Sequence, residues 1–346
     1  MGRRLIRPRR WMPPRVDDPG PTGPLIVVRR LGTGGHGPED VRFDQAGRVV
    51  TGLRDGRIVW LDSVTGDRGV LGETGGRPLG VWPLGDGGVL VCDHDRGLLE
   101  LGADGIVRVL ADRVGGEKLT FASNVVQGRD GTIWFTTSTS RWDVDDHVGD
   151  VLEHSCTGRL LRRDPDGTVT TLLADLKFGN GLVLAPDESF LLIAETTGYR
   201  IRRHRLGDTT TDTRTGTTTD TTTGTTTDIL VENLPGFPDN MSLGSDGLVW
   251  VAIAAPRNPL VDRLLPLPGF LRMLVWNLPD AIRPKAVPIA WVMAFDLDGK
   301  RVHDLRATDG SYGFVTSVAE RDGVVVIGSL TEDDVAVLAT TPPPAI

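Results

Sequence analysis

The chain has 346 residues, 39% of them hydrophobic, which is enough for a sizeable core in one large all-β unit. Its net charge of −8 argues against nucleic acid as the main partner. No apolar run reaches the roughly 18 residues that a membrane-spanning helix needs. The two cysteines, Cys92 and Cys156, form no CxxC pair, so we expect free thiols rather than a zinc site.

Residues 1–23 form a basic tail that lacks the apolar stretch of a secretory signal, so the default expectation is a cytoplasmic protein. The arginines between Arg3 and Arg10 favour a solvated segment. Membrane-surface contact with anionic lipid is the weaker alternative.

From residue 24 to residue 341, short alternating apolar runs are separated by turns such as Asp-Gly, a strong hairpin signal. Corresponding points recur at intervals of about 40 to 60 residues, the length of a four-stranded propeller blade. We therefore predict an all-β fold, a six-bladed β-propeller, followed by a short tail at 342–346. The predicted blade starts are Glu39, Leu79, Asn124, Asn180, Asp239 and Thr316. The strand at 24–31 has no blade of its own and is expected to complete the last one, closing the ring.

Two segments interrupt this pattern. Residues 207–228 are almost entirely Thr, Asp and Gly, which cannot contribute to a core and favour a disordered loop. Residues 257–288 are rich in leucine between prolines and predict a partly helical insertion in blade five. We expect this insertion to cover one mouth of the channel as a lid, with a membrane-surface patch as the alternative.

The innermost strands of propeller blades face the central channel, so polar residues at equivalent blade starts converge on one point. Four starts carry oxygen-bearing side chains separated by 85, 56 and 59 residues, with a fifth beside the last: Glu39, Asn124, Asn180, Asp239 and Asn240. Taken alone, an Asn before Gly is usually a turn residue. In register, two carboxylates and several amides form an all-oxygen set suited to Ca²⁺, or to another divalent cation such as Mg²⁺, Mn²⁺ or Zn²⁺.

The segments GPEDVRFD, SNVVQGRDGTIWFTTSTSR, FGNGLVLAPDESFLLIAETTGYRIRRHRL and LPGFPDNMSLGSDGLVWVA carry a family resemblance. In this order they resemble the strictosidine-synthase-like branch of the regucalcin/gluconolactonase superfamily, which includes the paraoxonases and diisopropyl fluorophosphatase. The resemblance implies a channel cation on the same five residues. It also implies that Asp239 can serve as base or nucleophile.

The chain departs from this family at two places. Thr316 stands where strictosidine synthase has its catalytic glutamate, which disfavours a strictosidine-synthase-like condensing enzyme. The histidine pair of the paraoxonases has no clear counterpart. His94 is a candidate second catalytic residue, and His147 and His154 lie in a long blade-three loop that could overhang the channel mouth.

These features predict a calcium-dependent hydrolase of the lactonase or arylesterase type. The ion would polarise the carbonyl of a small, apolar lactone or ester, and Asp239 or His94 would activate water. The alternative from another functional class is a non-catalytic binding propeller with a structural calcium ion.

Overall fold

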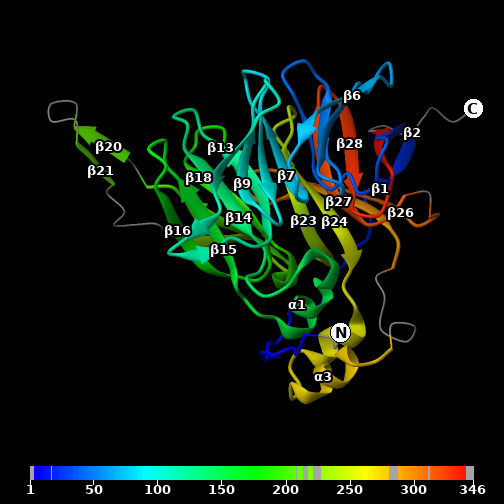
Figure 1. Ribbon diagram of the computed structural model, residues 1–346. Helices are drawn as coiled ribbons and strands as arrows, with labels where there is room; N and C mark the ends of the chain where they lie inside the picture. The colour runs from blue at the N-terminus through cyan, green and yellow to red at the C-terminus, as the bar shows by residue number, and fades with distance from the viewer. Residues whose placement is uncertain are drawn as a thin grey trace, which may run out of the picture.

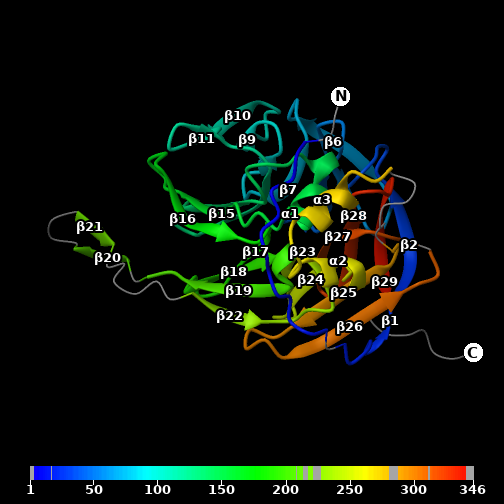
Figure 2. The ribbon, with the colours of Figure 1, turned by 90° about the horizontal axis from the view of Figure 1, so that it is seen from below.

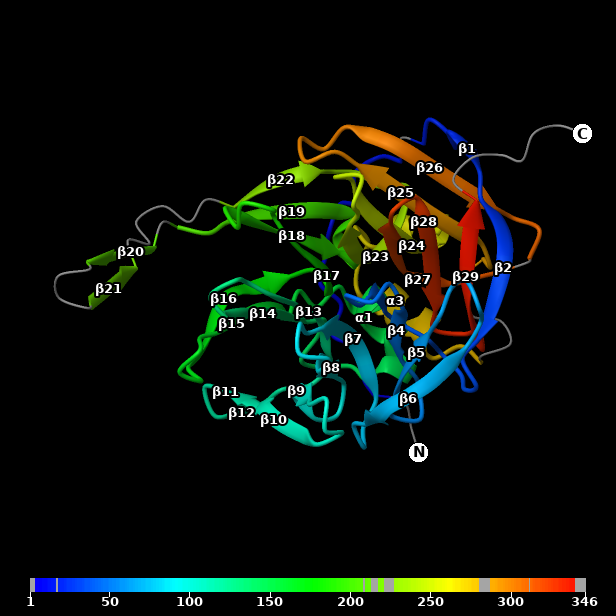
Figure 3. The ribbon, with the colours of Figure 1, turned by 90° about the horizontal axis from the view of Figure 1, so that it is seen from above.

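The structure is a computed structural model that describes residues 4–16, 18–207, 227–279, 287–310 and 312–339, with the backbone of 209–212 and 217–220. Six antiparallel sheets are arranged as blades around a central axis (Figure 1). Seen from above, the innermost strands lie closest to this axis (Figure 3). The predicted six-bladed propeller is confirmed.

Blades one to three follow one another along the chain, and in each blade the strands run from the centre outward in sequence order. Blade one contains β3 (Val41–Phe43), β4 (Val49–Gly52), β5 (Arg57–Leu61) and β6 (Arg68–Glu73). Blade two contains β7 (Pro78–Pro83), β8 (Val89–Asp93), β9 (Gly97–Leu101) and β10 (Val107–Ala111), followed by the small ribbon β11 (Arg113–Val114) and β12 (Glu117–Lys118). Blade three contains β13 (Ala122–Gln127), β14 (Ile133–Thr137), β15 (Gly158–Arg163) and β16 (Val169–Leu176).

The remaining three blades follow the same centre-to-rim order. Blade four contains β17 (Gly179–Leu184), β18 (Phe190–Glu195), the short 3₁₀ turn η2 (Thr196–Gly198), β19 (Arg200–Arg205) and β22 (Thr227–Val231). Blade five contains β23 (Gly236–Leu243), β24 (Val249–Pro256), β25 (Ala290–Phe295) and β26 (Arg301–Ala307), with β1 (Gly23–Pro24) added in parallel at its edge. Blade six contains β27 (Val315–Arg321), β28 (Val324–Ser329), β29 (Asp334–Ala339) and β2 (Ile26–Gly32).

The ring is closed by the N-terminal strand. Strand β2 pairs antiparallel with β29, with Leu31 opposite Val335, so the sixth blade joins the start of the chain to its end. This confirms the expected closure and covers the outer edge of β29. Apolar side chains then fill the space between blades, as where Trp250 of blade five packs with Val318 and Ile327 of blade six.

Three helices cover the lower end of the channel (Figure 2). The first, α1 (Val148–Glu153), follows the 3₁₀ turn η1 (Val144–Asp146) between β14 and β15. The other two, α2 (Pro259–Leu264) and α3 (Phe270–Trp276), lie between β24 and β25 and are the predicted insertion in blade five. Helix α2 begins with Asn258, whose side chain accepts hydrogen bonds from the backbone N–H groups of Leu260 and Val261.

The basic N-terminal segment differs from the solvated tail that the sequence suggested. Residues 4–16, which we call the strap, pack between α1 and α3. Ile6 is 1% exposed and lies in a cluster with Trp142 and Trp276. The ring of Trp11 stacks on His154 with centroids 4.3 Å apart. These two apolar side chains help to hold the basic segment against the cover.

Two predicted segments fall wholly or largely on residues outside the described part of the chain. The tail at 342–346 lies outside it. Of the Thr-rich segment, only the backbone of a small ribbon, β20 (Thr209–Asp212) and β21 (Thr217–Asp220), and its two ends are described. Within the described ranges, no helix is both long and apolar enough to span a bilayer.

Candidate functional site

The polar channel residues lie where the innermost strands lose their regular pairing. The register between β13 and β14 shifts between Ala122 and Val125, the interval that contains Asn124. Equivalent irregularities span Asn180 in β17 and Asp239 in β23. A bulge leaves residues out of the ladder and re-aims their side chains, which is why it often occurs beside functional sites. Three blades therefore turn polar side chains toward the channel by the same device.

Glycine allows the inner strands to approach one another closely. A Cβ atom on Gly181 would lie 2.5 Å from the backbone nitrogen of Met241 and 2.7 Å from the backbone oxygen of Asp239. Blade four can therefore touch blade five beside the polar residues only because residue 181 has no side chain. This close contact fixes the distance between Asn180 and Asp239.

All five predicted metal ligands belong to one buried polar cluster. Asn124 Nδ2 donates to Asn240 Oδ1 at 3.0 Å, and Asn240 Nδ2 donates to Glu39 Oε1 at 3.1 Å. Asn180 Nδ2 donates to Asp239 Oδ1 at 2.5 Å. Glu39, Asn180 and Asp239 line the channel cavity, whereas the other two lie behind them at 0% exposure. The structure therefore divides the five residues into a cavity-facing set and a supporting set.

A third carboxylate, that of Asp40, supports the cluster from behind. It is fully buried, accepts hydrogen bonds from Ser317 Oγ at 2.6 Å and from the backbone N–H of Val81 at 3.0 Å, and pairs with Arg42 at 3.4 Å. Asn124 Nδ2 also donates to it at 3.4 Å. Among the described residues Asp40 has a cationic partner whereas Glu39 and Asp239 have none, so the two cavity-facing acids lack charge compensation.

Burial raises the pKa of both cavity-facing carboxyl groups. The pKa of Asp239 is raised from 3.8 to about 8 by burial, and the hydrogen bond from Asn180 only partly opposes this. Burial, followed by the charges of Asp239 and Asp40, raises the pKa of Glu39 well above its ordinary value. No described lysine or arginine forms an ion pair with either group.

These features fit a divalent cation. Glu39 Oε2 is buried and has no hydrogen-bond partner, so one carboxylate oxygen is available as a ligand. Within the described ranges no group of three or more His, Cys, Asp or Glu residues is placed to hold a metal ion, so ligands beyond the two carboxylates would be amide, hydroxyl, backbone carbonyl or water oxygens. An oxygen-only set with two carboxylates matches the preference of Ca²⁺.

The cluster forms the floor of a cavity of about 520 Å³. Its walls are largely apolar and include one phenylalanine from each of four blades, a feature that we did not anticipate. We call these residues the phenylalanine collar: Phe121, Phe178, Phe237 and Phe314. Three of them have positive φ angles of 53°, 60° and 51° at positions 121, 178 and 314. Such a backbone is costly for a bulky residue, and strain of this kind concentrates at functional sites.

The cover helices provide the roof of the cavity. Val148 and Val151 of α1, Val261 of α2, and Val275 and Trp276 of α3 line it. Helices α2 and α3 of the blade-five insertion thus lie over this end of the cavity. The cavity is polar at one end and apolar over most of its wall.

His147 lines the cavity. Its Nδ1 lies 2.7 Å from the carbonyl oxygen of Val144, which can only accept, so Nδ1 carries the hydrogen and Nε2 is the basic nitrogen. Burial lowers the pKa of His147, which keeps the ring neutral at neutral pH. The sequence placed this residue in a loop over the mouth but could not separate it from its neighbour His154.

The other two candidate histidines, His94 and His154, lie outside the cavity. His94 packs edge-on against Phe121 with centroids 5.1 Å apart, behind the collar and not among the cavity-lining residues. Its Nε2 lies 3.7 Å from Asp143. His154 stacks on Trp11 beneath the strap, and burial lowers its pKa to about 3. Neither ring reaches the cavity wall.

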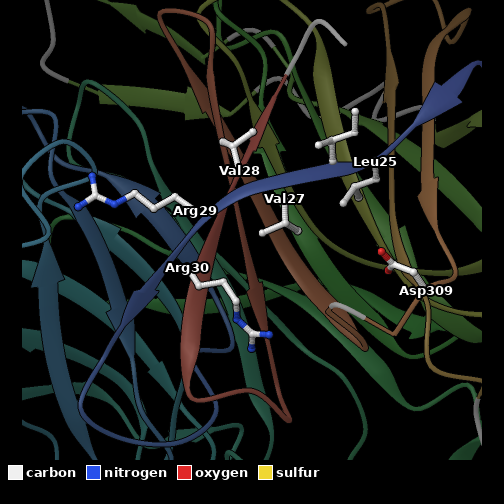
Figure 4. A pocket seen from close by; sticks show the side chains of 7 residues that line it. Leu25, Val27, Val28, Arg29, Arg30 and Asp309 are labelled. Carbon is white, nitrogen blue, oxygen red and sulfur yellow. The ribbon is translucent and has the colours of Figure 1, made fainter. Parts of the chain in front are cut away.

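A second cavity of about 580 Å³ lies along the outer strand β2, lined by residues 25–30 and Asp309 (Figure 4). It shares no residue with the channel cluster. Its walls come from the rim of the propeller, where no pair of buried carboxylates converges among the described residues. The channel cavity is therefore the stronger candidate for a reaction site.

Comparison with known proteins agrees with this fold. Family models of strictosidine synthase and of the N-terminal region of strictosidine synthase-like proteins match residues 123–209 and 27–61. Strictosidine synthase-like protein 13 of Arabidopsis thaliana is 33% identical, covering 79% of this chain and 73% of its own length. The adipocyte plasma membrane-associated protein of Mus musculus is 32% identical, covering 85% and 73%.

Solved structures with the same fold are more distant in sequence. A gluconolactonase from Xanthomonas campestris matches with a TM-score of 0.62 and 19% identity, covering 90% of this chain and 88% of that one. A calcium-binding protein, regucalcin, from Agrobacterium tumefaciens matches with a TM-score of 0.60 and 17% identity, covering 91% and 94%. At these identities the likeness concerns the fold.

Proposed function

Because the chain belongs to the strictosidine synthase-like family and holds two uncompensated buried carboxylates beneath an apolar cavity, we propose that it is a metal-dependent hydrolase of apolar lactones or esters. The observation that carries this proposal is the position of Glu39 and Asp239. Two buried acids with no basic partner are costly unless a cation or protons neutralise them.

The cavity-facing residues Glu39, Asn180 and Asp239 would hold the cation, and Asn124 and Asn240 would support them from behind through their hydrogen bonds. Ca²⁺ suits this set best, and Mg²⁺, Mn²⁺ or Zn²⁺ are possible substitutes. When bound, such a cation supplies a Lewis acid that polarises a carbonyl group and stabilises negative charge developing on its oxygen.

The shape and polarity of the cavity support an apolar substrate. A volume of about 520 Å³ accommodates a small organic molecule. The phenylalanine collar would contact its hydrocarbon part, while the carbonyl group would face the polar floor. The cover of α1, α2 and α3 would exclude bulk water, so that polar interactions at the floor act in a low-dielectric site.

We assign the general base to His147 in place of His94, since only His147 lines the cavity. Its neutral ring donates from Nδ1 to the Val144 carbonyl, which leaves Nε2 to accept a proton from water. Asp239 is the second candidate for this role. The condensing reaction is disfavoured because the position in blade six carries Thr316, whose hydroxyl donates to the Glu39 carbonyl oxygen at 2.7 Å.

A panel of lactones and aryl esters, assayed with and without a chelator, tests the proposal. We expect turnover that is lost on chelation, restored by calcium and abolished in Asp239→Asn. The matched control, Asp187→Asn, removes an exposed turn carboxylate and should retain full activity. His147→Gln should lower kcat by about 10²- to 10⁴-fold and remove the acid limb of the pH–rate profile.

Two results would reject the hydrolase. One is full activity in Asp239→Asn, and the other is activity indifferent to the chelator. Calcium binding without turnover of any member of the panel would instead support the binding propeller with a structural ion.

A further inference from the structure

The covered end of the propeller exposes an unusual share of the large apolar side chains. Fifteen such side chains are exposed among the described residues, and nine of them lie on the strap, on α1 or within the insertion at 257–288. They are Leu5, Met12, Val16, Val148, Leu260, Leu267, Phe270, Leu274 and Val287. Single exposed apolar residues are ordinary, but their concentration at one end indicates an interaction surface.

Helix α3 carries the most prominent part of this surface. Phe270 is 60% exposed and Leu274 is 61% exposed, and their spacing of four residues places them on the same face of the helix. The opposite face is buried through Arg272 and Trp276. The helix is thus anchored from behind while it presents an apolar ridge to the outside.

The strap packs against the buried face of the same helix. The indole nitrogen of Trp276 donates to the carbonyl oxygen of Arg4 at 2.8 Å, and the Arg272 guanidinium donates to that of Arg9 at 2.7 Å. The backbone N–H of Trp11 donates to the carbonyl oxygen of Leu265 at 3.2 Å. Figure 2 shows this blue segment crossing the end that carries the helices. The strap and α3 therefore lie together at the covered end of the propeller, which carries both the strap arginines and the apolar ridge.

The charge of this surface is opposite to that of the whole protein, whose net charge is −8. Six exposed arginines occur on the strap and α2: Arg4, Arg7, Arg9, Arg10, Arg15 and Arg263. None of them forms an ion pair with a described carboxylate. The one acidic residue within the described parts of the strap and the two insertion helices, Asp262, is itself paired with Arg257 at 2.9 Å.

We propose that the strap and the exposed faces of α2 and α3 dock on the surface of an anionic lipid bilayer. Phe270 and Leu274 would enter the boundary between headgroups and acyl chains, and the arginines would contact lipid phosphates. Apolar area and basic charge on one face are the two contributions that hold interfacial proteins. The acidic loop before α1 opposes this attraction only in part, because Asp145 is paired with Arg54 and Arg77.

This surface also surrounds the way into the cavity. Val148 and Val287 are 40% and 62% exposed, and both line the channel cavity. An apolar compound dissolved in the bilayer would therefore meet the cavity mouth without crossing water. The docking proposal does not depend on the hydrolase proposal, because it concerns the outer face alone.

Co-sedimentation of the full chain with vesicles tests the docking. Vesicles of phosphatidylcholine alone are compared with equimolar phosphatidylcholine and phosphatidylserine, at low and high ionic strength. We expect binding to the anionic vesicles that weakens as salt is raised, since exposed charges are screened.

Two paired variants separate the contributions. Phe270→Ser with Leu274→Ser removes the ridge and should weaken binding roughly 30-fold or more. Arg7→Gln with Arg10→Gln should weaken it roughly 30-fold at low salt, at about fivefold per arginine. Val64→Ser, which removes an 81%-exposed apolar side chain from blade one, is the matched control and should bind normally. Unchanged melting temperatures confirm that the variants fold.

Equal binding to both vesicle types, or binding unaffected by either paired variant, would overturn the proposal. So would an absence of vesicle binding together with a concentration-dependent dimer in sedimentation velocity that Phe270→Ser with Leu274→Ser abolishes. That result would make the patch a contact between two copies of the chain.

Discussion

Replacing Asp239 with asparagine should stabilise the metal-free protein at neutral pH, although it removes a proposed metal ligand. Burial raises the pKa of Asp239 from 3.8 to about 8 in the folded chain. Between these values the folded state retains a proton that the unfolded state has released. Stability therefore falls as pH rises through this window. Asparagine is neutral throughout and avoids the loss.

The magnitude follows from this pKa difference. At about 1.4 kcal/mol per pKa unit, the raised pKa lowers the stability of the metal-free fold by roughly 4 kcal/mol at pH 7 relative to pH 4, because the unfolded chain ionises and the folded chain does not. The stability difference is the unfolding free energy of Asp239→Asn minus that of the wild type. From pH 4 to pH 7 this difference should increase by roughly the same amount. Saturating calcium should reverse the order, because the cation compensates the carboxylate in the wild type alone.

Urea unfolding at a series of pH values, with chelator and then with calcium, measures this difference. Asp150→Asn is the matched control, since Asp150 is a buried carboxylate outside the channel whose pKa burial raises to about 6. Its stability difference should stop growing near pH 6 and should ignore calcium. A pH-independent difference for Asp239→Asn, or no effect of calcium on the wild type, would refute the reasoning.

Three further substitutions test the parts that position the site. Gly181→Ala places a methyl group 2.5 Å from a blade-five backbone nitrogen. It should lower the unfolding free energy, measured by urea titration, by about 1–3 kcal/mol. The control Gly32→Ala places its methyl group 3.6 Å from a flexible side chain and should change this free energy little. Phe178→Leu removes a collar ring whose centroid lies 5.4 Å from that of Phe121. It should raise KM for a bulky aryl ester about 2- to 10-fold more than KM for a small lactone. Equal effects on both substrates would contradict a collar that binds substrate. Ile6→Ala changes a 1%-exposed side chain and should lower the unfolding free energy by about 2–5 kcal/mol in calorimetry. Leu5→Ala, at a 60%-exposed position, should lower it by less than about 0.5 kcal/mol. Similar small effects of both substitutions would mean that the strap is not anchored.

The blade starts were predictable because a repeated position carries repeated chemistry. The same position in three blades carries a polar residue that precedes an alternating strand: Asn124, Asn180 and Asp239. A single sequence was therefore enough to predict that these residues are equivalent. The phenylalanine collar has a similar repeated pattern in the sequence. A phenylalanine stands two or three residues before each of these positions and before Thr316.

Other features depend on contacts between residues far apart in sequence. Ile6 and Trp11 lie in a basic segment whose sequence suggested a solvated tail. Ile6 is buried and Trp11 partly buried because both pack with residues of the distant α1 and α3. Likewise nothing local distinguishes His147 from His94. The choice depends on which loop folds over the channel and which ring lies behind Phe121.

The central claim is that the channel carboxylates hold one divalent cation, and calorimetric titration of the chelator-treated protein with calcium tests it most directly. We predict one ion per chain in the wild type, none in Asp239→Asn and an unchanged isotherm in Asp150→Asn. Calcium binding of equal stoichiometry and affinity in wild type and Asp239→Asn would contradict the claim.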